Sequence, residues 1–266
     1  MRQWRLIYDL PTPGTRNMAI DEALLMTNPV QPVLRLYRWM PFCLSLGYGQ
    51  RSREADRQRL ADRGWDLVRR PTGGRAILHG DELTYSLVLP ADHPLAAGGV
   101  LPSYQRISEA LVRSLREMVT ELDASQQDNN TASGPVCFDV PSHYELTVQG
   151  RKLVGSAQVR RKSGILQHGT IPLHGDIGRI CDVLAYTNEA DRETARQHVR
   201  QRATTLGEAL RHQRVNWESV ADSIARGFAS TFGIEWVPGT LTDAEQETAN
   251  WLENDVYGSD AWTFRR

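Results

Sequence analysis

Apolar residues recur at helical spacing in several parts of the chain. The segment 17–26 reads NMAIDEALLM and follows a helical pattern behind Asn17, a residue that can cap a helix. The segment 104–122 carries four apolar side chains on one face, which should cover a sheet. Beyond Asp176 the pattern is mainly helical and predicts a small helical cap. Its expected helices lie near 177–185, 189–199, 204–210, 215–231 and 242–256.

Between these segments the apolar residues alternate or form short runs, which is typical of strands. Strands are expected at 33–39, 42–48 and 82–89, with a charged helix over 51–63 that Gly64 ends. A loop containing two glycines follows 68–70, and we expect a hairpin around it. The polar segment 123–135 predicts a surface loop that serves as a lid beside the residues after it. An antiparallel meander is predicted from three later runs, 144–148, 153–159 and 165–173.

Length and charge limit the classes of function. A chain of 266 residues can bury a sizeable core as one large domain. Its 31 basic and 32 acidic residues give a net charge of −1, so no overall charge favours nucleic acid or a membrane surface. The first residues turn polar too early for a secretory signal, and no apolar run reaches the roughly 18 residues of a membrane span. We therefore expect a cytoplasmic protein, a monomer by default, whose recognition of partners is local.

One cysteine and one lysine carry the strongest chemical signal. Three cysteines are too few and too scattered for a disulfide framework or a closed zinc site, so no metal is expected. Cys43 and Cys181 lie in apolar patterns typical of buried, inert thiols. Cys137 lies in the irregular stretch GPVCFDVPSHYEL, and Lys152 lies in QGRKLVGSAQ. A cysteine beside a lysine cation can be a thiolate at neutral pH, and thiolates attack acyl groups.

A second motif, RRPTGGRAILH at 69–79, places two glycines among cationic side chains. Gly73 and Gly74 would let the backbone approach a ligand closely, which suits an anion, a carbonyl or a pantetheine arm. The alternatives are a tight turn with solvated or ion-paired arginines. The motif matches neither a P-loop nor a Rossmann fingerprint. Its candidate substrate-binding side chains are Arg69, Arg70, Arg75 and His79.

Two further groups are candidates for the wall of the site. Gly155, Ser156 and Ala157 form a run of small residues in a predicted strand, against which an acyl chain or another backbone can lie. His168 and Gly169 follow in the next predicted strand. A histidine in a strand is more often structural than catalytic, so His168 is placed in the wall and not in the chemistry.

The motifs NMAIDEALL, LSLGYGQ, RRPTGGRAILH, VCFDVPSHYEL and GRKLVGSAQVRRKSGILQHGTI resemble those of the biotin and lipoate protein ligase superfamily, and within it the LipM-type octanoyltransferases. The resemblance covers nearly the whole chain. It implies an α/β (α+β) fold of mixed, largely antiparallel sheets packed with helices. One catalytic domain over 1–266 would have its core at about 30–235 and a helical C-terminal extension. The resemblance also implies an acyl-enzyme at Cys137 and makes Lys152 the residue that lowers the cysteine pKa.

The same resemblance implies the reaction partners. The donor would be octanoyl on the phosphopantetheine of acyl carrier protein, and the acceptor a lysine of a lipoyl domain such as the glycine cleavage H protein. Transfer from thioester to amide needs no ATP, cofactor or metal. His79, or Lys152 when transiently neutral, is a candidate base for the acceptor amine.

Several alternatives stay open at this point. ATP-dependent lipoate ligases resemble the chain but usually carry a third glycine and a His-Asp pair, where this chain reads Gly74-Arg75 and His79-Gly80. Octanoyl amidotransferases between lipoyl proteins share the fold and also use a cysteine. An octanoyl tunnel could be lined by apolar residues for which core packing is the alternative: Leu44, Leu46, Tyr48, Leu78 and Val154. Acidic partners could dock on basic residues that are otherwise solvated turns: Arg69, Arg70, Arg151, Arg160, Arg161 and Lys162.

Overall fold

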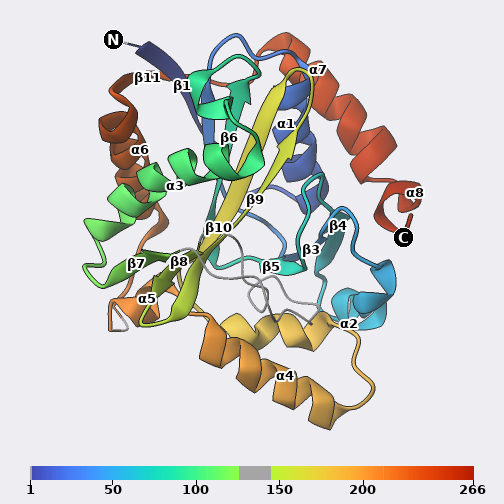
Figure 1. Ribbon diagram of the computed structural model, residues 1–266. Helices are drawn as coiled ribbons and strands as arrows, with labels where there is room; N and C mark the ends of the chain where they lie inside the picture. Colours follow the sequence, from blue (N-terminus) through green and yellow to red (C-terminus); the bar gives the residue numbers. More distant parts are fainter. Residues whose placement is uncertain (1, 126–144, 212) are drawn as a thin grey trace.

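The computed structural model describes residues 2–125, 145–211 and 213–266, and it contains one large and one small β-sheet (Figure 1). The strands of the large sheet, in spatial order, are β11 (Ile234–Pro238), β1 (Arg2–Tyr8), β2 (Val33–Tyr37), β6 (Glu82–Pro90), β10 (Gly164–Pro172), β9 (Arg151–Arg160), β8 (Glu145–Val148) and β7 (Leu122–Ser125). β11, β1 and β2 run parallel to one another, and every other neighbouring pair is antiparallel. The predicted mixed, largely antiparallel sheet and the meander of its last strands are confirmed.

Helices cover both faces of the large sheet. α3 (Val100–Arg116) and α6 (Trp217–Phe232) pack together on one face, while α1 (Gly14–Met26) and α7 (Asp243–Leu252) lie on the other. The remaining α-helices are α2 (Arg57–Asp62), α4 (Glu189–Arg202), α5 (Leu206–Ala209) and α8 (Asp260–Thr263). Short 3₁₀ turns cover Ser52–Glu54, Pro94–Ala96 and Ile177–Val183, and Glu253–Tyr257 is a π-helical turn. The described part of the chain contains no helix that is long and apolar enough to cross a membrane.

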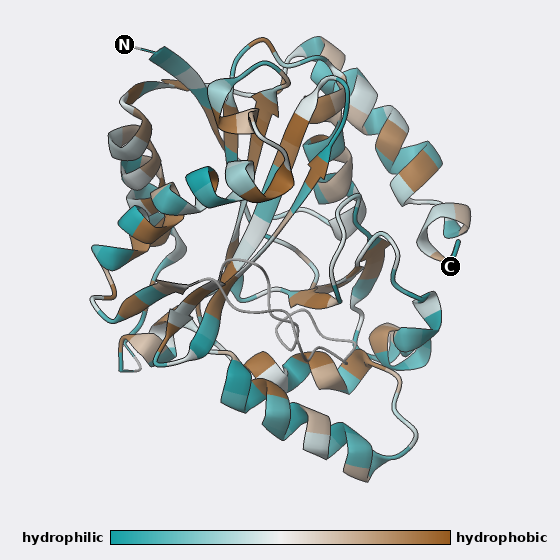
Figure 2. Cartoon of the chain, in the orientation of Figure 1, coloured by the Kyte–Doolittle hydropathy of each residue, from teal (hydrophilic) through white to brown (hydrophobic). Residues whose placement is uncertain are grey.

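β6 shows why this sheet is covered on both sides. All of its first eight residues are buried, and its side chains divide alternately between the two cores. Leu83, Tyr85 and Leu87 belong to the core under α3 and α6, whereas Val88 belongs to the core under α1. A strand that is apolar on both faces needs a layer on each side. Figure 2 accordingly shows apolar residues along the central strands and polar ones on the outward surface of the helices.

The small sheet has the order β4 (Asp66–Arg69), β3 (Cys43–Leu46) and β5 (Ile77–His79). The expected hairpin around the glycine loop is therefore wrong. β4 pairs parallel with β3 and β5 pairs antiparallel with it, so the loop between β4 and β5 crosses over the end of β3. β3 takes the central position because all four of its residues are buried.

Several element boundaries differ from those expected. α1 starts at Gly14, so Asn17 lies inside the helix and is not its cap. Its side chain is buried and donates to the carbonyls of Thr12 and Arg38. The expected helix over 51–63 is a 3₁₀ turn followed by α2, which begins after Asp56 because that side chain accepts from the Arg59 amide.

Three strands were not expected. β1 and β11 pair in parallel although more than 200 residues separate them, and residues 122–125 of the expected polar region form β7. The rest of the expected loop, 126–135, lies outside the described residues, and so does its expected role as a lid. The C-terminal part is mainly helical, as predicted, but β11 joins the large sheet and α7 packs on α1.

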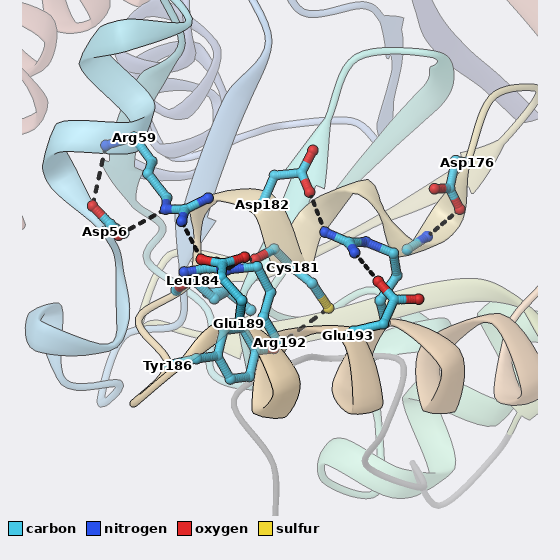
Figure 3. Close-up of polar contacts among 12 residues, drawn as sticks. Asp56, Arg59, Asp176, Cys181, Asp182, Leu184, Tyr186, Glu189, Arg192 and Glu193 are labelled. Carbon is cyan, nitrogen blue, oxygen red and sulfur yellow. Dashed lines mark hydrogen bonds and ion pairs between the residues drawn. The ribbon is translucent and has the colours of Figure 1, made fainter.

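Ion pairs attach α4 to the rest of the molecule (Figure 3). Arg196 pairs with Asp182 and Glu193, while Arg59 on α2 reaches Glu189. Cys181 lies beneath this network, wholly buried, and its sulfur accepts a hydrogen bond from the Tyr186 hydroxyl at 3.4 Å. Arg59, Arg192, Arg196 and Arg200 on this surface therefore face carboxylates or backbone carbonyls.

Candidate active site

A narrow pocket opens where the two sheets meet. It is tightly closed, with a cavity volume of only about 20 Å³. Seven of the residues predicted from sequence line it: Arg70, His79, Gly155, Ser156, Ala157, His168 and Gly169. These residues come from the two sheets, with the first two in or beside β4 and β5 and the others on β9 and β10.

The apolar part of the pocket comes from residues that the sequence analysis did not single out. Met18 lies on α1, Tyr37 ends β2, and Trp39 and Ile77 complete the lining. The Trp39 ring stacks on the His79 ring with centroids 3.9 Å apart and planes 9° from parallel. The alternation of Tyr37 and Trp39 in VLRLYRW was a usable signal, because residues two apart in a strand share a face.

His168 connects the glycine loop to α1. Its Nε2 lies 2.6 Å from the Thr72 hydroxyl oxygen, and its Nδ1 lies 3.0 Å from an oxygen of Asp21. A carboxylate can only accept, so Nδ1 carries the proton and Nε2 accepts from Thr72. Burial lowers the pKa of His168 below its ordinary value, and the hydrogen bond to Asp21 offsets this only in part. A neutral His168 therefore holds the wall of the pocket, as its placement there predicted.

Asp21 is the buried centre of this network, and sequence reasoning missed it. Arg35 donates to one of its oxygens at 2.8 Å, and Tyr37 donates to the other at 2.8 Å. Burial raises the pKa of Asp21, but the hydrogen bond from His168 and the charge of Arg35 outweigh it, so the net pKa is lowered. An acidic residue inside the apolar pattern of NMAIDEALL was the only signal for it in the sequence.

His79 is fixed by both ring nitrogens. Nδ1 lies 2.6 Å from a Glu82 oxygen and Nε2 lies 2.8 Å from the Ser45 hydroxyl. The Thr84 hydroxyl donates to the same Glu82 oxygen and in turn accepts from the Trp39 indole at 2.8 Å. The ring therefore stands in the pocket wall in one orientation, held by groups on β3 and β6 and stacked on Trp39.

The glycine loop is closed by backbone contacts. Gly74 has a φ of 93°, a conformation that favours glycine, and its carbonyl oxygen packs so closely on Gly47 that a Cβ there would collide with it. Gly73 is exposed and has open space at its Cβ position. Arg70 lies beneath and donates to the carbonyls of Gly73 at 2.8 Å and Arg75 at 2.7 Å. Its guanidinium thus fixes the loop from below.

The other two arginines of the motif lie away from the pocket. Arg69 is wholly buried, and its guanidinium donates to backbone carbonyls of Gly47, Gln50 and Thr263. It therefore ties α8 to the segment after β3. Arg75 is partly exposed and lies 3.8 Å from Glu54, which is the ion-pair alternative considered above.

Lys152 is buried in β9, with only 3% of its surface exposed. Its carbonyl accepts from the Thr204 amide at 3.0 Å, which brings the segment before α5 against the strand. Three residues further along β9 begins the Gly155–Ala157 wall, where Tyr85 donates to the Ser156 hydroxyl at 2.7 Å. Gly169 faces Ser156 across the sheet and leaves no room for a Cβ.

The cysteines divide as predicted where the structure describes them. Cys43 and Cys181 are both wholly buried free thiols. Burial, followed by the charges of Asp66 and Glu82, raises the pKa of Cys43 well above its ordinary value, which disfavours the reactive thiolate. Cys137 lies outside the described residues.

Two further expectations concern side chains around the site. The tunnel candidates mostly pack in the core: Leu44, Leu46 and Leu78 belong to the core under the small sheet, and Val154 to the large core, while Tyr48 is exposed. The alternative role as packing residues is therefore confirmed for the four that are not exposed. Docking on Arg69 and Arg70 is wrong, because Arg69 is buried against the segment after β3 and Arg70 is buried under the glycine loop.

The remaining docking candidates lie nearer the surface. Arg151 lies 2.9 Å from Glu208, and Arg160 donates to the carbonyls of Ala96 and Gly99. Arg161 and Lys162 are exposed at the turn after β9. No group of three or more side chains suited to a metal occurs among residues 2–125, 145–211 and 213–266.

Comparison with known proteins defines the class. The family model described as the lipoyl protein ligase A/B catalytic domain matches residues 13–229. A bipartite lipoate protein ligase from Thermoplasma acidophilum has a similar structure, with a TM-score of 0.83 and 26% identity over 99% of this chain and 97% of that one. A lipoate-protein ligase A solved with ATP gives a TM-score of 0.81 at 26% identity over 99% of each chain. The fold is therefore that of a lipoyl protein ligase catalytic domain.

Sequence relatives narrow the family. Octanoyltransferase LipM from Kyrpidia tusciae is 41% identical over the full length of both chains. Relatives of the same name from other bacteria match at 36–40% identity. The chain belongs to the LipM octanoyltransferases, a family of acyl-transferring enzymes.

Proposed function

We propose that this enzyme moves an octanoyl group from octanoyl-acyl carrier protein to a lysine of a lipoyl domain, with the glycine cleavage H protein as acceptor. The group passes through a thioester on Cys137, and Lys152 supplies the positive charge that favours the Cys137 thiolate. The reaction belongs to lipoylation of proteins, takes place in the cytoplasm and uses neither ATP nor a metal.

The chemistry balances in two acyl transfers. The Cys137 thiolate attacks the thioester carbonyl of the donor, a C–S bond forms, and the C–S bond to pantetheine breaks to release its thiolate, which takes up a proton. The neutral ε-amine of the acceptor lysine then attacks the enzyme thioester. A C–N bond forms, Cys137 leaves as the thiolate, and the amine proton passes to a base. Both steps pass through a tetrahedral oxyanion that needs hydrogen-bond donors.

The observation that carries the proposal is the burial of Lys152 on the strand that forms the pocket wall. Lysine side chains are rarely buried, so a buried lysine on the strand that lines the pocket is a candidate for a role in the chemistry. Lys152 lies three residues from Gly155, and the small residues of β9 and β10 line the pocket opposite Trp39 and Ile77. An acyl chain that enters from the pocket mouth would meet this wall of small residues.

The two histidines of the pocket are held by their neighbours, which fits a positioning role and not proton transfer. Both nitrogens of His79 are engaged by Ser45 and Glu82, and His168 is engaged by Asp21 and Thr72. Deprotonation of the acceptor amine by His79 would require that ring to leave Ser45. Lys152, when transiently neutral, is the other candidate base.

A second candidate is ATP-dependent ligation of a free acid. The structural likeness to a lipoate-protein ligase A solved with ATP favours it. Against it, the loop holds Gly73 and Gly74 with Arg75 in place of a third glycine, and Arg75 turns toward Glu54. Transfer of octanoyl between two lipoyl proteins is a third route, which differs only in the donor.

A transfer assay separates these routes. The purified chain is mixed with a lipoyl-domain acceptor and one of three donors: octanoyl-acyl carrier protein, octanoate with ATP, or an octanoylated lipoyl domain. Octanoylation of the acceptor from the carrier protein without ATP supports the proposal. Octanoylation only from the free acid with ATP, or only from the other lipoyl domain, contradicts it.

A further inference from the structure

The C-terminal residues and the segment after β3 form an open, strongly basic concavity. Its described lining comprises eight residues, four of them arginine and none acidic: Tyr48, Gly49, Arg51, Ser52, Arg53, Phe264, Arg265 and Arg266. The surface around α4, by contrast, carries arginines that pair with carboxylates (Figure 3). None of the ion pairs among the described residues involves any of these four arginines, although the chain as a whole carries a net charge of −1.

The concavity is held in a fixed shape. The Arg265 guanidinium lies over the rings of Tyr48, at 3.9 Å, and Trp262, at 3.8 Å, and donates to the Tyr48 carbonyl. The amide and hydroxyl of Ser52 both donate to the Arg266 carbonyl. Positive charge is thus presented by a preorganised surface, and not only by flexible side chains.

The concavity adjoins the glycine loop of the active site. The Tyr48 amide donates to the Thr72 carbonyl at 2.8 Å, and the Thr72 hydroxyl contacts His168 in the pocket wall. Gly47, the neighbour of Tyr48, packs against Gly74. A partner seated on the arginines would therefore lie beside the loop but outside the pocket, and would need a long arm to place an acyl group in it.

We propose that this concavity, defined by Arg51, Arg53, Arg265 and Arg266, is the docking surface for the acyl donor, an acidic carrier protein that presents the acyl group on a phosphopantetheine arm. The proposal rests on the proposed function and adds the surface to it. Charge complementarity selects a partner rich in carboxylates. The need for a long arm indicates that the docked partner is the donor and not the acceptor. An acceptor lysine side chain is short, so the acceptor domain must lie directly over the pocket.

Two pairs of charge reversals test the assignment. Arg51→Glu with Arg53→Glu changes the concavity and leaves Arg265 on its aromatic rings. Arg113→Glu with Arg226→Glu makes the same charge change on α3 and α6, on the other side of the molecule (Figure 1). KM and kcat are measured with three donors: octanoyl-acyl carrier protein, octanoyl-coenzyme A, and octanoyl-pantetheine, which has no protein and no phosphate. Binding of acyl-free carrier protein is measured alongside.

The first pair should raise KM for the carrier-borne donor and weaken carrier binding roughly tenfold or more, and should flatten their dependence on salt. Its kinetics with octanoyl-pantetheine should match the wild type, and the second pair should match it with both donors. Unchanged carrier binding and KM in the first pair would overturn the docking assignment. An equal rise in KM with octanoyl-coenzyme A would show that the arginines bind the phosphate of the arm, which would also overturn the docking assignment. A wild type that binds the carrier but uses no thioester donor would contradict the proposed function alone.

Discussion

Asp21→Asn should destabilise the folded protein more than any exposed charge change. One Asp21 oxygen accepts from Arg35, and the other accepts from Tyr37 and His168, all inside the core. Asparagine has one acceptor oxygen, so its amide group would face donors on one side of this network. Arg35 would keep its contact with Asp9 at 2.6 Å but lose its buried partner.

The size of the effect follows from burial. Removing one partner of a buried ion pair typically costs about 3–5 kcal/mol, which corresponds to a fall in Tm of roughly 6–20 °C for a domain of this size. The control is Glu218→Gln, which removes an ion pair to Arg38 whose side chains are 39% and 66% exposed. Exposed pairs contribute about 0–1 kcal/mol.

Urea unfolding followed by tryptophan fluorescence at pH 7 measures both variants against the wild type. A change of less than about 1 kcal/mol in Asp21→Asn, equal to the change in Glu218→Gln, would refute the reasoning that the Asp21 network is a charged structural centre of the site.

Three further predictions concern the site. Lys152→Met should slow acyl transfer roughly 10²-fold or more and move its pH profile to higher pH, whereas Lys162→Met, at an exposed position, should leave both as in the wild type. Burial lowers the pKa of His168, so protons bind preferentially to the unfolded chain and stability should fall as the pH drops below about 6.5. When the free energy of unfolding is measured between pH 5 and 7.5, its change with pH should be smaller in His168→Gln than in the wild type. An identical change with pH in both proteins would contradict the buried, neutral state of His168. Gly169→Ala places a Cβ 2.7 Å from the Gly155 carbonyl and should destabilise by about 1–3 kcal/mol while lowering transfer. Gly49→Ala, with open space around it, is the stability control and should leave the free energy of unfolding unchanged.

Local patterns predicted much of the fold because the signals lie within single elements. The meander of β8, β9 and β10 followed from three short runs with polar turns, and α3 followed from one apolar stripe. The β1–β11 pair was missed because its partners are more than 200 residues apart. The hairpin was wrong because β3, not the loop, decides how β4 and β5 pair.

The candidate site was predictable where small or reactive residues stand out from their surroundings. Gly155–Ala157 and His168 line the pocket, and the two inert cysteines are buried, as their contexts indicated. The lining by Met18 could not be inferred, because it depends on how α1 meets strands far along the chain, whereas the shared face of Tyr37 and Trp39 was a signal that was missed. Arg69 was wrongly expected to bind substrate or a partner, because nothing in the local sequence distinguishes a buried arginine that donates to backbone carbonyls.

Intact-protein mass spectrometry tests the central claim most directly. The purified chain is mixed with octanoyl-acyl carrier protein without ATP, beside Cys137→Ser and the matched variants Cys43→Ser and Cys181→Ser. The account predicts one octanoyl adduct on the wild type and on both matched variants, and none on Cys137→Ser. An adduct that persists in Cys137→Ser, or no adduct on the wild type while an acceptor is octanoylated, would contradict acyl transfer through Cys137.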